Sequence, residues 1–158
     1  MSDIKKQKDY GTNLSYKNFN KLYKLFLTSS FMANFRKHTT SSGLNIIGGR
    51  DAENNDELVW AAQPTDVLLH TDAPGSPFVN VGSGVSKNDI KEAAVFCAKY
   101  SQDWRDSKRD VVVHRFLRSD MNKSKRMKVG TWEVKKREKL RVKKADILEF
   151  ERRLNETN

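Results

Sequence analysis

The stretch DVLLHTDAPGS, residues 66–76, holds a histidine and two carboxylates within seven positions. If residues 67–72 form a strand, alternation places Asp66, His70 and Asp72 on one face. His70 and Asp72 are then roughly 6–7 Å apart, which suits a metal pair or a general base with its orienting carboxylate. A metal site needs further ligands, and the other two histidines show no ligand spacing to this pair. The local pattern leaves two interpretations open, a catalytic centre and a structural histidine at a strand end.

Two further features receive structural interpretations. Cys97 is the single cysteine, which excludes an intramolecular disulfide, and its alanine and phenylalanine neighbours predict an inert buried thiol. Gly48 and Gly49 match neither the spacing of a phosphate-binding loop nor that of a dinucleotide fingerprint, and no helix with the pattern of such a motif is expected after Gly49. A turn or bulge with close backbone approach explains the two glycines. We expect no metal and no cofactor.

The formal net charge of +10 is concentrated in one quarter of the 158-residue chain. Residues 105–144 hold 16 Lys and Arg against 5 Asp and Glu, whereas the rest of the chain holds 14 basic and 15 acidic side chains. Such clustering is typical of a protein that binds a phosphate backbone, because cations that neutralise phosphates release counterions. Aromatic residues lie among these cations, at Trp104, His114, Phe116 and Trp132. They could stack on unpaired bases or belong to the core.

Short apolar runs between Gly, Pro, Asn and Asp predict strands at 44–47, 58–61, 67–69, 78–81 and 111–116. We expect them to form a mostly antiparallel sheet. The segment TWEVKKREKLRV, residues 131–142, predicts a basic hairpin with Trp132, Val134, Leu140 and Val142 on one face.

Helical spacing of apolar residues predicts one long central helix, capped at Ser86 and Asp89 and continuing to Trp104. A short C-terminal helix is expected at 145–154, and an N-terminal helix at 14–34 follows a disordered leader at 1–13. The sequence therefore predicts an α+β domain over 35–154. No apolar run approaches the ~20 residues of a membrane span and no signal-peptide core is present, so we expect a cytoplasmic protein.

Four blocks of the sequence resemble, in order, the NFACT-R domain, the RNA-binding module of ribosome-associated quality-control factors of the NEMF type. The blocks are GLNIIGGRDAENNDELV, DVLLHTDAPGS, IKEAAVFCAKYSQDW and MKVGTWEVKKREKLRV. The resemblance covers about residues 35–142 and implies a stand-alone α+β RNA-binding domain. The positions that match the family's motifs with structural roles are Gly48, Gly49, Asn55, Asp66, Gly75, Glu92, Ser101, Trp104 and Gly130.

The resemblance and the charge together imply a non-catalytic protein that binds tRNA or rRNA and is linked to translation quality control, with the large ribosomal subunit as a candidate partner. Arg50, His70 and Asp72 are expected to form a polar patch at this surface. The other expected RNA-binding residues are Arg105, Lys108, Arg109, Arg115, Arg118, Lys123, Lys125, Arg126, Lys128, Trp132, Lys135, Lys136, Arg137, Lys139 and Arg141. Two alternatives stay open: an RNA-processing enzyme centred on Asp66, His70 and Asp72, and a module that binds proteins or anionic membranes.

Overall fold

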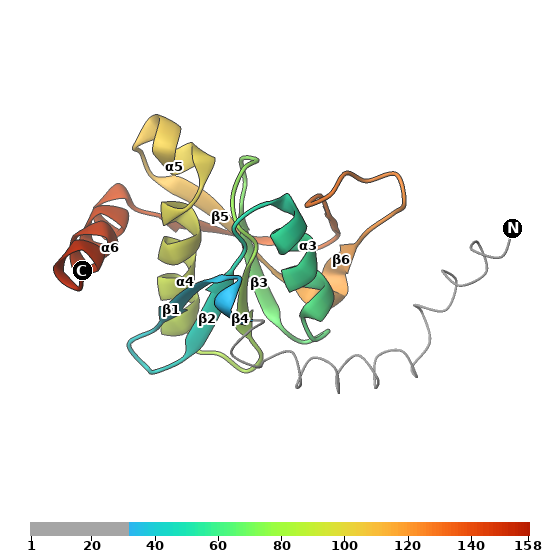
Figure 1. Cartoon of the computed structure of the whole chain (residues 1–158), viewed down its shortest axis with the longest axis horizontal. Helices are drawn as coiled ribbons and strands as arrows, with labels where there is room; N and C mark the ends of the chain where they lie inside the picture. Colours follow the sequence, from blue (N-terminus) through green and yellow to red (C-terminus); the bar gives the residue numbers. More distant parts are fainter. Residues whose placement is uncertain (1–31) are drawn as a thin grey trace, which may run out of the picture. The chain divides into compact units, whose positions relative to one another are not determined.

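A six-stranded sheet forms the centre of the computed structural model, which describes residues 32–158 (Figure 1). The strands follow the order β1-β2-β4-β3-β5-β8, and every neighbouring pair is antiparallel. The predicted class, α+β with a mostly antiparallel sheet, is confirmed. The leader at 1–13 and all but the last three residues of the helix at 14–34 lie outside the described residues. The strands are Arg36–Thr39 (β1), Asn45–Gly48 (β2), Val67–Thr71 (β3), Val79–Gly82 (β4), Val111–Leu117 (β5) and Glu138–Val142 (β8).

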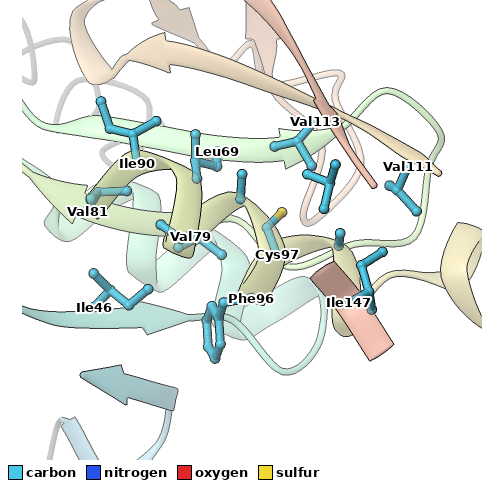
Figure 2. Packing of buried hydrophobic residues seen from close by; sticks show 14 of the residues in the cluster. Ile46, Leu69, Val79, Val81, Ile90, Phe96, Cys97, Val111, Val113 and Ile147 are labelled. Carbon is cyan, nitrogen blue, oxygen red and sulfur yellow. The ribbon is translucent and has the colours of Figure 1, made fainter. Parts of the chain in front are cut away.

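The hydrophobic core lies between one face of this sheet and α4 (Lys87–Lys99) (Figure 2). Ala93 and Ala94 are buried at the centre of α4, where their small side chains let the helix approach the strands closely. α6 (Lys144–Glu156) packs beside α4 and buries Ile147 in the same core, which confirms the predicted C-terminal helix. Cys97 is fully buried, which confirms the predicted core position of its thiol, and this burial raises the pKa of the thiol to about 12.

The long central helix is interrupted at Ser101, so it is shorter than predicted. The capping prediction is confirmed, because the Ser86 hydroxyl accepts a hydrogen bond from the Asp89 backbone N–H. Ser101 then donates its hydroxyl to the Ala98 carbonyl and accepts from the Trp104 N–H, which ends one helix and begins α5 (Gln102–Ser107). Apolar spacing continues across the interruption because both helices bury residues in one core. No helix of residues 32–158 is long and apolar enough to cross a membrane.

The predicted strand at 58–61 is wrong, since these residues form the last turn of helix α3 (Ala52–Ala61). A helix therefore does begin shortly after Gly49, at Ala52, where no helix with the pattern of a phosphate-binding motif was expected. The Asp51 side chain caps α3 by accepting a hydrogen bond from the Asn54 N–H at 2.8 Å. Two asparagines belong to the buried face of α3, so the hydrophobic period of this helix is weak. Figure 1 shows α3 on the side of the sheet opposite α4.

The basic hairpin predicted at 131–142 does not form. β7 (Glu133–Val134) pairs with β6 (Met121–Asn122) in a separate two-stranded sheet, whereas β8 pairs with β5. A short 3-10 helix, Arg118–Asp120, connects β5 to β6, and residues 135–137 connect the two sheets. Alternation of apolar residues predicts strands correctly here, but it does not specify the partner of a strand. Strand β1 was not predicted because its four residues are basic or polar and only half-buried at alternate positions.

Candidate nucleic-acid interface

The β5–β8 side of the sheet presents cations on the face opposite α4. Val111 and Val113 of β5 belong to the core beneath α4, so Val112 and His114 lie on the other face. Directly opposite these two residues on β8 are Arg141 and Lys139, respectively. Residues paired across two strands share a face, and both cations are exposed. This open sheet face is defined here by Val112, His114, Lys139 and Arg141.

His114 is the buried polar centre of the open sheet face. Its side chain is only 6% exposed, and Nε2 lies 3.0 Å from Oδ1 of Asp72, which is itself exposed. The contact is close enough for an ion pair, although Nε2 has no hydrogen bond in the structure. Burial lowers the pKa of His114, the Asp72 carboxylate opposes this effect, and the cations Arg137 and Lys139 lower the pKa further. The neutral imidazole is therefore favoured beside the exposed cations.

His70 and Asp72 do not form the predicted pair, because each has another partner. His70 Nδ1 lies 2.7 Å from the Thr71 carbonyl, so Nδ1 must carry the proton and donate. The ring packs on Phe78, with ring centroids 4.5 Å apart, and burial lowers the pKa of His70. The structural interpretation of His70 fits these contacts, and it is His114, on the neighbouring strand, that approaches Asp72.

Asp66 is buried at the start of β3 and serves the scaffold. Its carboxylate accepts hydrogen bonds from the Gln63 N–H at 2.8 Å, the Asn80 amide at 3.0 Å and the Ser83 hydroxyl at 3.0 Å. The carboxylate is thus fully engaged, and the arrangement of Asp66, His70 and Asp72 expected for a catalytic centre is not formed. Within residues 32–158, no group of three His, Cys, Asp or Glu is placed to hold a metal ion.

Arg50 follows β2 and lies near Arg36, which is paired with Gly48. Arg36 donates a hydrogen bond to the Gly49 carbonyl and lies over the Tyr100 ring, 4.8 Å from its centroid. Burial lowers the pKa of Arg36, and the nearby charges of Arg50 and Arg105 lower it further. Arg105 donates a hydrogen bond to the carbonyl of the same Tyr100 at 3.3 Å, so three arginines lie near the end of β2. Arg36 was missed because it lies outside the basic quarter of the sequence.

The remaining motif residues build the scaffold. Gly75 has φ +84, and its carbonyl accepts a hydrogen bond from the Gln102 N–H at 2.7 Å, which joins the turn after β3 to α5. The Glu92 carboxylate accepts from the Ser41 N–H at 3.0 Å, and the Trp104 indole donates to Glu151 at 2.7 Å. Gly130 has φ +78, and a side chain there would meet the backbone of Ala52.

Some of the predicted RNA-binding cations are engaged within the protein. Lys123 lies 2.8 Å from Asp56, Arg141 lies 2.9 Å from Asp110 and Arg115 lies 3.2 Å from Glu138. Lys108, at φ 51, lies over the Trp104 ring. The predicted cations that are exposed on the surface are Arg50, Arg105, Lys108, Arg109, Lys125, Arg126, Lys128, Lys135, Lys136, Arg137, Lys139 and Arg141. Within the described part of the chain, Arg141 is the only one of these that forms an ion pair, and Lys135, Lys136, Arg137 and Lys139 form an exposed run without one.

The aromatic residues predicted to lie among the cations are buried, while a different aromatic residue is exposed. Trp104 and Phe116 belong to the interior, and Trp132 is 9% exposed. The Trp132 indole N–H donates to Asp56 at 2.8 Å, and its ring meets Trp60 edge-on at a centroid distance of 4.8 Å. Trp60, at the end of α3, is 45% exposed. It was missed because residues 58–61 were predicted to be a strand.

The lowered pKa of His114 predicts a specific pH dependence of stability. An unfolded histidine has a pKa near 6.5 and the folded value lies below it, so the unfolded chain binds the extra proton first. The contribution of His114 to the free energy of unfolding is therefore complete above pH ~6.5, and it decreases as the pH falls through that value. Between about pH 7.5 and 5, the midpoint temperature of thermal unfolding should decrease less for His114→Gln than for the parent chain. An NMR titration that places the pKa of His114 above 6.5 would contradict this prediction.

Comparisons with known proteins agree with the fold and identify the family. Residues 32–136, about two thirds of the chain, match the family model described as the NFACT protein RNA binding domain. A solved structure, the C-terminal part of the fibronectin/fibrinogen-binding protein from Streptococcus suis, is similar at a TM-score of 0.64 and 18% identity. The match covers 84% of this chain and 58% of that chain, so this chain spans little more than half of it. No curated protein sequence matches. The sequence blocks, the antiparallel sheet and the family match together show that this chain belongs to the NFACT RNA-binding domain family.

Proposed function

We propose that the chain is a non-catalytic, cytoplasmic protein that binds structured RNA, either tRNA or rRNA, in translation quality control. The observation that carries this proposal is the run Lys135, Lys136, Arg137 and Lys139, which is exposed and has no ion pairs within the described residues. Unpaired cations in a row can each meet a phosphate without first breaking an internal contact. The family supports RNA as the partner, and the large ribosomal subunit is the proposed platform.

The open sheet face offers a second source of contacts at the same edge. Lys139 and Arg141 project from β8, the last strand in the sheet order, and Arg137 lies just before that strand. His114 on the neighbouring strand is favoured in its neutral form. It therefore contributes no charge to the attraction of a phosphate. We therefore propose that phosphates bind along residues 135–141, and that Arg50, His70 and Asp72 fix the geometry of their loops or contact a sugar or base edge.

The salt dependence of RNA binding tests this proposal. The logarithm of the affinity should fall linearly with the logarithm of the salt concentration, with a slope set by the number of phosphates neutralised. Filter binding or fluorescence anisotropy with a tRNA and an rRNA fragment would measure the slope between about 50 and 200 mM salt. Affinity that does not change with salt would contradict a phosphate-binding surface. Cross-linking in cells, followed by sequencing of the bound RNA, would distinguish tRNA from rRNA and show whether the ribosome is involved.

A further inference from the structure

Trp60 is the one aromatic side chain among the large hydrophobic residues exposed in the described part of the chain. Its side chain is 45% exposed at the last turn of α3. The other exposed large hydrophobic residues are Leu117, Val129 and Leu148. Exposing an indole leaves a large apolar ring face in water, which folding alone does not require. The exposed face of this ring is therefore available to a binding partner.

The Trp60 ring is supported from within the protein. Trp132 meets it at 68° between the ring planes, and the Trp132 indole N–H is fixed by Asp56. The Arg118 guanidinium carbon lies 5.0 Å from the centre of the Trp132 ring and 5.7 Å from that of Trp60. Arg118 Nε also donates to the Val59 carbonyl at 2.7 Å, in the turn that carries Trp60. Two indoles and one guanidinium therefore form a rigid group, named here the tryptophan cluster.

The tryptophan cluster is tied to a basic loop, residues 123–128. Lys123 Nζ lies 2.8 Å from Asp56 and 5.2 Å from the centre of the Trp132 ring, and it donates to the carbonyls of Lys128 and Thr131. The loop holds four cations and no acidic residue, and Lys125, Arg126 and Lys128 are exposed. Figure 1 shows this loop, drawn in orange beyond β6, next to α3. An exposed aromatic face thus borders a surface that complements a polyanion.

We propose that Trp60 stacks on an unpaired nucleobase of bound RNA while the phosphates on either side contact the loop 123–128. This inference rests on the proposed function and names the part of the RNA that the tryptophan cluster recognises. Paired stems hide the faces of their bases, so only a loop, bulge or end can offer one to an indole. A stack of this kind requires an aromatic face beside cations, which is what Trp60 and the exposed loop residues provide.

The test uses two RNAs that differ only in unpaired bases, a perfect duplex and the same stem closed by a single-stranded loop. Trp60→Ala should weaken binding of the looped RNA by about 5- to 100-fold and leave the duplex within about twofold. Trp60→Phe keeps an aromatic face and should retain most of the affinity. Leu148→Ala is the matched control, since Leu148 is 46% exposed on α6, and it should bind both RNAs like the parent chain.

Trp60→Leu guards against a loss of folding, because leucine keeps apolar contact with Trp132 but cannot stack on a base. It should show the same selective loss as Trp60→Ala. Equal weakening of both RNAs, or unchanged binding of the looped RNA, would overturn the proposal, as would a Trp60 variant that loses a protein partner while RNA binding stays intact. If the parent chain binds neither RNA, the proposed function itself fails, so the two failures are distinguishable.

Discussion

Changing Lys135, Lys136 and Arg137 together to glutamate is expected to weaken binding of every structured RNA by roughly 10- to 100-fold at moderate salt. The three side chains are exposed and form no ion pair within the described residues, so all of their charge is available to phosphates. Reversing the charge of these side chains removes their attraction for the RNA phosphates and adds repulsion between carboxylates and phosphates. The slope of log affinity against log salt should also become shallower, by about one for each phosphate that the protein no longer neutralises.

The fold should survive this triple change. Residues 135–137 connect β7 to β8 without belonging to either strand, and the structural contact there is made by the Lys135 backbone N–H, which donates to the Asp120 carbonyl at 2.9 Å. Glutamate retains this backbone bond. Fewer like charges in the basic quarter will, if anything, reduce internal repulsion, so thermal unfolding should change little.

Changing Lys37, Lys87 and Lys91 together to glutamate provides a matched control. All three are exposed and lie outside the basic quarter, on β1 and on α4. Changing these three residues to glutamate alters the net charge equally, and β1, which carries Lys37, is at the opposite end of the strand order from β8. The affinity of this control variant should fall much less than that of the first triple variant. Equal losses would show that net charge alone attracts RNA, and loss confined to one RNA would indicate that bases rather than phosphates are read.

Much of the fold can be predicted from the local periodicity of the sequence. The prediction errors occur where the structure depends on features that local periodicity does not contain. β3, β4 and β5 are rich in β-branched residues, and α4 shows a clear helical period under a serine cap. α3 was missed because Asn54 and Asn55 occupy buried positions that a hydrophobic pattern does not count. The partners of β7 and β8 depend on contacts far apart in the sequence, which no window of residues contains.

The site was predictable in composition but not in arrangement. The charge excess of residues 105–144 can be counted in the sequence, and much of it lies on the surface. Which histidine meets Asp72 depends on the register of β3 against β5, where His70 and His114 are directly opposite. A sequence window around Asp72 contains His70 alone, so it proposes the wrong pair. The exposure of Trp60 likewise depends on the helix that the sequence pattern concealed.

Asn55→Ala is expected to lower the free energy of unfolding by about 2–4 kcal/mol, because one side chain serves two buried backbone groups. Its carbonyl oxygen accepts from the Phe78 N–H at 2.9 Å, and its amide donates to the Ser76 carbonyl at 3.3 Å. Alanine would leave both groups unsatisfied in the interior between α3 and β4. Urea unfolding would measure the change, with the exposed Glu53→Ala in the same helix as a control expected within about 0.5 kcal/mol of the parent chain.

Gly49→Ala should destabilise the same structure for a reason that depends on Asn55. A Cβ at residue 49 would lie 1.9 Å from the Asn55 side-chain oxygen, so the amide would have to leave its two partners. In the double variant Gly49→Ala, Asn55→Ala that oxygen is absent, and the nearest remaining atom is the residue 55 Cα at 3.2 Å. The decreases in the free energy of unfolding caused by the two single changes should therefore add up to more than the decrease in the double variant. Simple additivity would show that Gly49 is required for a reason other than room for Asn55, and the family's paired glycines would then need a different physical explanation.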